Sequence, residues 1–269
     1  MSTRREKAHL DLIVQQFSKQ SVPFSEMRQR SHEEAIELLM RATRVTALDT
    51  ALDVACGPGL VALAFAKVAR QVVGIDVTPA MIDRARALQA ERDLPNVSWQ
   101  IGDVAHLPFP DDTFTIVTCR YALHHVFDPR AVAAEMVRVC APGGRVALVD
   151  VVTTAEKSAA YNRMEKLRDP SHVRALKLDE LFALATQNGL VLMDSQFYRM
   201  EVELETLLRG SFSNAGDEAQ VREMLVQDIG HDVLGASVSL RGTETIVAYP
   251  IALVVGEKRP SARARETLE

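Results

Sequence analysis

Between residues 49 and 152, short apolar runs alternate with amphipathic runs, and this alternation restricts the fold more than any other feature of the chain. The apolar runs have the length of strands, and the amphipathic runs have helical spacing. We predict strands at 49–55, 71–76, 97–102, 114–119 and 144–152, and helices at 58–70, 79–92 and 129–140. Strands that alternate with helices in this way form a mostly parallel sheet with helices on both faces. The predicted fold class is therefore α/β.

The same pattern divides the chain into four parts. Residues 1–45 are predicted to form an N-terminal helical lid, and residues 46–155 a core that binds a ligand. Residues 156–256 are expected to complete the sheet and to carry an inserted helical cap, because they are too long for a simple crossover. Residues 257–269 are polar and are expected to form a flexible tail.

Within the outer parts, the first predicted helix covers residues 6–19 and ends before Pro23, which lacks a backbone donor. The cap is predicted to contain a strand at 190–198 and a helical region at 203–230. A last strand is predicted at 244–255.

Composition narrows the function classes. The 269 residues carry a formal net charge of −5, which argues against a nucleic-acid partner. Three cysteines, which are few and not spaced as metal pairs, indicate free thiols in a reducing compartment, and no metal site is expected. The longest apolar run is at 246–255, much shorter than the roughly 20 residues of a membrane-spanning helix. We therefore expect a cytoplasmic protein, whose oligomeric state the sequence leaves open.

The segment ALDVACGPGL, residues 51–60, is the first candidate ligand site. Gly57 and Gly59 follow a predicted strand and let the backbone approach a ligand closely. Extended to Ala62, the segment also reads G-x-G-x-x-A, which is typical of dinucleotide sites. Asp76 closes the next strand, where a carboxylate binds both hydroxyls of a ribose. These features predict a nucleoside ligand and leave a nicotinamide-dependent oxidoreductase as one alternative.

Three features favour a different nucleoside. Asp53 precedes the glycines, and its charge would repel a pyrophosphate but tolerate an ammonium or sulfonium group. Asp103 and Val104 follow the third strand, where they suit an adenine amino group and ring. Val77 and Met81 follow Asp76 and are expected to pack against the base.

The ordered runs ALDVACGPG, GIDVTPAM, GDVAHLPFPDDTFTIVTCRYALHHV and VRVCAPGGRVALVD resemble the class I S-adenosylmethionine-dependent methyltransferases, and most of all the ubiquinone/menaquinone C-methyltransferase-like group. The resemblance covers about residues 45–155. It implies a Rossmann-like fold with a mostly parallel seven-stranded sheet and a helical lid, S-adenosyl-L-methionine as the cofactor, and a small-molecule acceptor. The cofactor-binding residues that it implies are Asp53, Ala55, Gly57, Gly59, Asp76, Val77, Met81, Gly102, Asp103, Val104, Cys119 and Arg120.

The acceptor side is less defined by the sequence. An acceptor proton must leave during methyl transfer, and a histidine near the methyl group suits that task. The segment RYALHHV offers His124 and His125, and it offers Arg120 and Tyr121 as groups that orient an acceptor. Each of these side chains is also compatible with a packing role. A non-catalytic protein that retains the cofactor fold is the second alternative, since a fold alone does not establish turnover.

Overall fold

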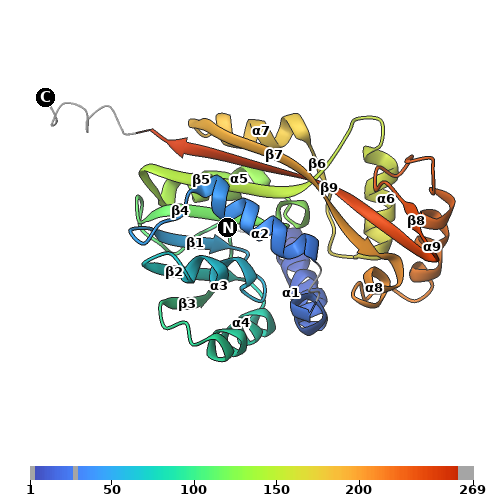
Figure 1. Ribbon diagram of the computed structural model, residues 1–269, viewed down its shortest axis with the longest axis horizontal. Helices are drawn as coiled ribbons and strands as arrows, with labels where there is room; N and C mark the ends of the chain where they lie inside the picture. The colour runs from blue at the N-terminus through green and yellow to red at the C-terminus, as the bar shows by residue number, and fades with distance from the viewer. Residues whose placement is uncertain (1–3, 27–29, 260–269) are drawn as a thin grey trace, which may run out of the picture.

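The computed structural model describes residues 4–26 and 30–259, and in this part of the chain nine strands form a sheet (Figure 1). The main path of the sheet is β3-β2-β1-β4-β5-β9-β7, with β6 beside β5 and β8 beside β9. The seven strands of this path confirm the predicted sheet, whereas β6 and β8 were not predicted. The strand bounds are β1 Thr50–Val54, β2 Gln71–Asp76, β3 Val97–Ile101, β4 Phe114–Arg120, β5 Cys140–Thr153, β6 Leu176–Lys177, β7 Leu190–Glu203, β8 Ser239–Arg241 and β9 Glu244–Lys258.

The first five strands of the path are parallel, and β9 runs antiparallel to both β5 and β7. The chain therefore reverses its strand order between β1 and β4. In open sheets of this kind, ligands bind at the carboxyl ends of the strands beside that reversal.

Helices cover both faces of the sheet, as predicted. Ala51, Ala147 and Val149 point to the face that carries α2 (Arg30–Thr43), α3 (Leu60–Ala66) and the buried end of α4 (Pro79–Arg92). Leu52 and Leu148 point to the face that carries α5 (Pro129–Val139) and α7 (Leu178–Thr186). Because side chains alternate along a strand, the continuous apolar runs of the core strands supply both faces at once.

The cap lies at one end of the molecule, beyond the ends of the core strands (Figure 1). It contains α6 (Ser158–Arg168), α8 (Leu204–Arg209), α9 (Asp217–Gln227) and β8. Helix α8 packs on β7 and β9, β8 pairs with β9, and α9 packs against both α6 and α8. The predicted helical region 203–230 is thus divided by residues 210–216. Strand β9 continues to Lys258, into the segment that was expected to form the tail, and residues 260–269 of that tail lie outside the described residues.

Helix α1 (Arg4–Glu26) includes Pro23, so the prediction that this proline ends the helix was wrong. A proline removes only its own backbone donor, and here the helix ends three residues later. Tertiary hydrogen bonds also hold the helix: the Gln16 side chain donates to the Ser211 carbonyl at 2.6 Å, and the Gln20 side chain to Asp169 Oδ2 at 3.2 Å. Contacts with the cap therefore stabilise a helix that its sequence alone would shorten.

Candidate functional site

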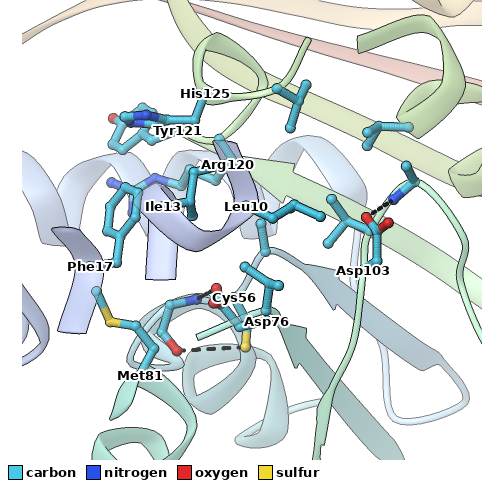
Figure 2. A pocket seen from close by; sticks show the side chains of 18 of the residues that line it. Leu10, Ile13, Phe17, Cys56, Asp76, Met81, Asp103, Arg120, Tyr121 and His125 are labelled. Carbon is cyan, nitrogen blue, oxygen red and sulfur yellow. Dashed lines mark hydrogen bonds between the residues drawn. The ribbon is translucent and has the colours of Figure 1, made fainter. Parts of the chain in front are cut away.

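A cavity of about 260 Å³ lies at the carboxyl ends of β1, β2 and β4 (Figure 2). Its floor includes Asp53 from β1, Asp76 from β2 and the turn that contains Gly57. Arg120 and Tyr121, which follow one another at the end of β4, form one side, and Asp103 and Val104 lie at the opposite end. Polar groups from separate strands therefore converge on one cavity.

Helix α1 covers this cavity. Glu6, His9, Leu10, Ile13 and Phe17 all line it, and their spacing of three and four residues places them on one face of the helix. The sequence predicted the apolar side of this helix but not that it faces the ligand site. Helix α1 also packs against α4, which follows Asp76 in the chain. An apolar helix face thus separates the cavity from solvent.

Asp76 organises the glycine turn. Its Oδ2 accepts a hydrogen bond from the Gly57 amide at 2.9 Å, and its Oδ1 accepts one from the Thr78 amide at 2.8 Å. Burial raises the pKa of Asp76, and these two amide hydrogen bonds oppose the rise. Each carboxylate oxygen retains a lone pair, so Asp76 can accept two further hydrogen bonds from a ligand.

Asp53 is the most buried carboxyl group of the cavity. It accepts hydrogen bonds from the Ala62 amide at 3.1 Å and from the Thr118 hydroxyl at 3.1 Å. Burial raises the pKa of Asp53 to about 7, although both hydrogen bonds and the charge of Arg120 act in the opposite direction. A cationic ligand in the cavity would favour its ionised form.

Asp103 holds the loop at the opposite end of the cavity. Its Oδ1 accepts a hydrogen bond from the Ala105 amide at 2.9 Å, and its Oδ2 lies 3.3 Å from His106 Nδ1. Asp103 is only partly buried, and Val104 next to it contributes an apolar wall. This end of the cavity offers a carboxylate acceptor beside a flat apolar surface.

The guanidinium of Arg120 is the cation of the cavity wall. Its Cζ lies 4.0 Å from the centre of the Tyr121 ring, a distance typical of a cation–π contact. The Tyr121 hydroxyl lies 2.9 Å from the hydroxyl of Tyr198, which comes from β7. Nε and Nη2 of Arg120 are buried and have no hydrogen-bond partner in the described part of the chain.

The two adjacent histidines have different surroundings. His124 is turned away from the cavity, and its Nδ1 lies 2.5 Å from Asp150 Oδ1. Burial alone would lower the pKa of His124, but the Asp150 carboxylate outweighs it and the net shift is upward. His125 lines the cavity, and burial, together with the charge of His124, lowers its pKa to about 3.

The tautomer of His125 follows from its hydrogen bonds. Ser171 donates its hydroxyl proton to Asp169 at 2.6 Å, so the Ser171 oxygen must accept the proton of His125 Nδ1, which is 3.1 Å away. A neutral imidazole has one N–H, and Nε2 of His125 therefore carries the lone pair. His125 thus offers the cavity a hydrogen-bond acceptor, and His124 does not reach it.

Most of the residues predicted to bind the cofactor lie together around the cavity. Those that line it are Asp53, Ala55, Gly57, Asp76, Val77, Met81, Asp103, Val104 and Arg120, joined on the acceptor side by Tyr121 and His125. Gly59, Gly102, Cys119 and His124 do not line it. Burial raises the pKa of the Cys56 and Cys119 thiols well above the ordinary value, so neither is an activated nucleophile.

Position 59 requires glycine because of packing inside the protein and not because a ligand must approach it. It precedes α3 with φ of 80°, and a Cβ at this position would lie 2.3 Å from the Trp99 ring. Gly57, with φ of 53°, has no protein atom closer than 4.0 Å to such a Cβ. The two glycines of the motif therefore serve different purposes.

We expect Gly59→Ala to lower the free energy of unfolding by about 2–4 kcal/mol, since it combines backbone strain with overpacking against Trp99. Gly143→Ala is the matched control, because Gly143 has a similar φ of 75° but no atom within 4 Å of the added Cβ. The control should lose only about 1 kcal/mol. Urea unfolding followed by circular dichroism measures both, and equal losses would show that Trp99 does not restrict this position.

The described residues contain no group of three or more His, Cys, Asp or Glu side chains placed to hold a metal ion. Among the helices of the described ranges, none has the length and apolar character needed to cross a membrane.

Comparisons with known proteins agree with this geometry. Residues 52–148 match a family described as a methyltransferase domain. Over 247 residues the chain is 31% identical to YcgJ of Bacillus subtilis (strain 168), described as an uncharacterized methyltransferase, covering 90% of this chain and 98% of YcgJ. It is also 40% identical over 110 residues to the 2-phytyl-1,4-naphtoquinone methyltransferase of Synechococcus elongatus. That match covers 38% of this chain and 46% of the relative.

Solved structures give the same result. The crystal structure of YcgJ superimposes with a TM-score of 0.78 at 30% identity, covering 86% of this chain and 100% of that YcgJ chain. The Bacillus halodurans C-125 protein BH2331 superimposes with a TM-score of 0.76 at 26% identity, covering 84% of this chain and 100% of that protein.

Proposed function

This chain belongs to the class I S-adenosylmethionine-dependent methyltransferases, and we propose from that premise that it methylates a small molecule with an apolar body. The single observation that carries the proposal is the cavity between three carboxyl groups at strand ends and the largely apolar face of α1. The acidic composition of the chain favours a metabolite over a nucleic acid as the acceptor.

The cavity fits S-adenosylmethionine in its chemistry. This donor carries an ammonium, a sulfonium, two ribose hydroxyls and an adenine amino group, which are cations or hydrogen-bond donors, together with one carboxylate. Asp53 and Asp76 in the floor and Asp103 at one end of the cavity offer carboxyl oxygens to these groups. We assign Asp76 to the ribose, Asp103 and Val104 to the adenine edge, and Asp53 and the Gly57 turn to the methionine half.

The protein's contribution to the reaction is positioning and exclusion of water. When bound, the donor supplies an electrophilic methyl group, which an in-line displacement moves to the acceptor. Leu10, Ile13 and Phe17 keep the cavity apolar on the side of α1, and a dry, aligned site accounts for most of the rate enhancement such a transfer needs. His125 offers its Nε2 lone pair to an acceptor O–H or N–H and so orients it.

The acceptor class is supported by the lining and by relatives. Phe17, Leu10 and Phe127 line the cavity and give it apolar surface beside the polar Glu6 and His9 of α1. One relative is a 2-phytyl-1,4-naphtoquinone methyltransferase, whose named substrate is apolar and cyclic. An aromatic, quinone-like or secondary metabolite is the acceptor that this combination favours.

A labelled-methyl assay tests the proposal. The protein is incubated with a metabolite extract and isotopically labelled S-adenosylmethionine, and the products are analysed by mass spectrometry. We expect a labelled small molecule that forms only when the protein is present. Binding of S-adenosylhomocysteine without any labelled product would favour the non-catalytic alternative. Saturable NADH binding without S-adenosylhomocysteine binding would favour the oxidoreductase alternative.

Donor binding is expected to release about half a proton at pH 7 and more of a proton just below that pH. Burial raises the pKa of Asp53 to about 7 in the free protein, and the positive charge of the ligand lowers it again. The free protein should also lose stability as the pH rises from about 4 to about 7. An unfolded Asp has a pKa of about 4, whereas Asp53 of the native state retains its proton up to about pH 7.

Calorimetry in buffers of different ionisation enthalpy measures the number of protons released. Asp53→Asn, which has no titratable group, should bind S-adenosylhomocysteine with little proton release. Identical proton release by Asp53→Asn and the wild type would assign the proton to another group.

A further inference from the structure

We propose that Arg120 and the Tyr121–Tyr198 pair form an anion site for the methyl acceptor. The acceptor would then be an apolar molecule that carries a carboxylate or another anionic oxygen. This inference rests on the proposed function and names the substrate class of that same site.

The first observation is a partly buried guanidinium, two of whose nitrogens have no hydrogen-bond partner in the described part of the chain. Nε and Nη2 of Arg120 are buried, and neither has a hydrogen-bond partner in the described ranges 4–26 and 30–259. These two nitrogens lie on one edge of the guanidinium, where their N–H groups point in parallel and match the two oxygens of a carboxylate. Buried donors without a partner are costly, and an anionic ligand would offset that cost.

The second observation is a spare hydroxyl proton on the tyrosine pair that contacts Arg120. The Tyr121 and Tyr198 hydroxyls lie 2.9 Å apart, and either can be the donor. Two hydroxyls need only one proton for the bond between them, so the pair retains one more proton to donate. Burial raises the pKa of Tyr198, and the Tyr121 hydroxyl adds to the rise while Arg120 opposes it, so this hydroxyl stays protonated.

No carboxylate of the protein neutralises the guanidinium in the described part of the chain. Asp53, Asp76 and Asp103 accept hydrogen bonds from backbone amides and neighbouring side chains, and none forms an ion pair with Arg120. His32, which faces the group from α2, has its pKa lowered to about 3 by burial and by the charge of Arg120. It is therefore neutral and leaves Arg120 as the positive charge of this wall.

The position of the guanidinium favours the acceptor over the carboxylate of the donor. Its neighbours Tyr198 and His32 come from β7 and α2, and of the three carboxyl groups that we assign to the donor only Asp53 is influenced by its charge. Figure 2 shows the Arg120 side chain reaching toward Phe17 of α1, at the end of the cavity away from Asp103. Charge and apolar surface thus meet where the lid, the cap and the core converge.

Calorimetry on the complex with S-adenosylhomocysteine tests the site. The probes are benzoate, 2-naphthoate and octanoate, each compared with its own primary amide. We expect at least one carboxylate to bind the wild-type complex about tenfold more tightly than its amide, which corresponds to about 1.4 kcal/mol. In Arg120→Met the preference for carboxylates should disappear. The affinity for S-adenosylhomocysteine should stay within about threefold of the wild type, which is less than the loss of one charge-assisted hydrogen bond would cause.

Arg130→Met is the matched control, because Arg130 is exposed near the same cavity at the start of α5. It should keep the carboxylate preference. Arg120→Lys retains the charge but not the two-pronged edge, so it should keep only part of the preference. If Arg120→Met does not fold, the comparison of each carboxylate with its amide on the wild-type complex still shows whether the cavity prefers an anionic ligand.

Three results would overturn the inference. No carboxylate preference by the wild-type complex contradicts it directly. A tenfold loss of S-adenosylhomocysteine affinity in Arg120→Met, with unchanged affinity for 5′-methylthioadenosine, would assign Arg120 to the donor's carboxylate. Failure of the wild type to bind S-adenosylhomocysteine contradicts the proposed function itself, and so differs from a complex that forms without preferring carboxylates.

Discussion

Asp76→Ala is expected to weaken the binding of S-adenosylhomocysteine by about 10²- to 10³-fold. The carboxylate is assigned two charge-assisted hydrogen bonds to the ribose, which together contribute roughly 2–4 kcal/mol. It also accepts the amide hydrogen bonds of Gly57 and Thr78, so its removal releases the turn that faces the ligand. Titration calorimetry on the purified variant measures the change.

Asp83→Ala is the control for this experiment, since Asp83 lies on α4 just beyond Asp76 and its side chain is 72% exposed in an ion pair with Arg86. It should bind S-adenosylhomocysteine as the wild type does. Thermal unfolding of both variants separates a lost contact from a disrupted fold. Unaltered affinity in a folded Asp76→Ala protein would refute the assignment of Asp76 to the ribose.

The core could be predicted because its signals are local. Strand β2 and helix α4 have the predicted bounds, 71–76 and 79–92, since each is a periodic run that ends at a turn residue or proline. The convergence of carboxyl groups on the cavity could be predicted from local signals as well. Parallel strands end at one edge of the sheet, and a polar residue at the end of each strand is therefore brought to that edge.

Contacts between distant segments could not be predicted in this way. The apolar side of α1 was evident, but its position over the cavity depends on α1 packing against α4. His124 and His125 are adjacent in the chain, and only the placement of Asp150 and Ser171 separates their roles. Likewise Gly59 looks like a ligand-binding glycine until Trp99, from another strand, is seen to occupy the space beside it.

The lengths of β7 and β9 show a related limit. Strand β7 pairs with β9 along its whole length, from Leu190 opposite Lys258 to Glu203 opposite Ile246, and the outer ends of both strands support the cap. The outer part of β7 is only partly apolar, so its periodicity is weak and the predicted strand stopped at residue 198. Cross-strand pairing, not the pattern of β7 itself, extends it.

The largest loss of stability is expected from Glu165→Gln in the cap. Glu165 on α6 is 2% exposed and accepts hydrogen bonds from Arg168, with Nη2 2.6 Å from Oε2, and from the Tyr249 hydroxyl at 3.0 Å. Glutamine keeps the volume but leaves the Arg168 charge buried without a counter-ion. Breaking a buried pair in this way costs about 3–5 kcal/mol, a large part of the 5–15 kcal/mol that stabilises a typical domain.

Glu218→Gln provides the contrast, because Glu218 is 52% exposed in its ion pair with Arg222. Exposed pairs contribute about 0–1 kcal/mol, so this control should unfold at nearly the wild-type urea concentration. A second variant, Glu165→Gln with Arg168→Met, removes the unpaired charge and should recover part of the loss. Equal unfolding midpoints for Glu165→Gln and Glu218→Gln would show that the buried pair contributes no more than a surface one.

The consequence of Glu165→Gln should extend beyond the cap. Arg168 also donates to the Ser211 hydroxyl at 3.2 Å, and the Ser211 carbonyl accepts from Gln16 of α1 at 2.6 Å. The buried pair is thus connected through Ser211 to the helix that covers the cavity. If the helix acts as a lid, Glu165→Gln should weaken S-adenosylhomocysteine binding in addition to lowering stability, whereas the exposed control should change neither. Calorimetry below the unfolding transition separates the two effects, and wild-type affinity in a destabilised variant would show that α1 closes independently of the cap.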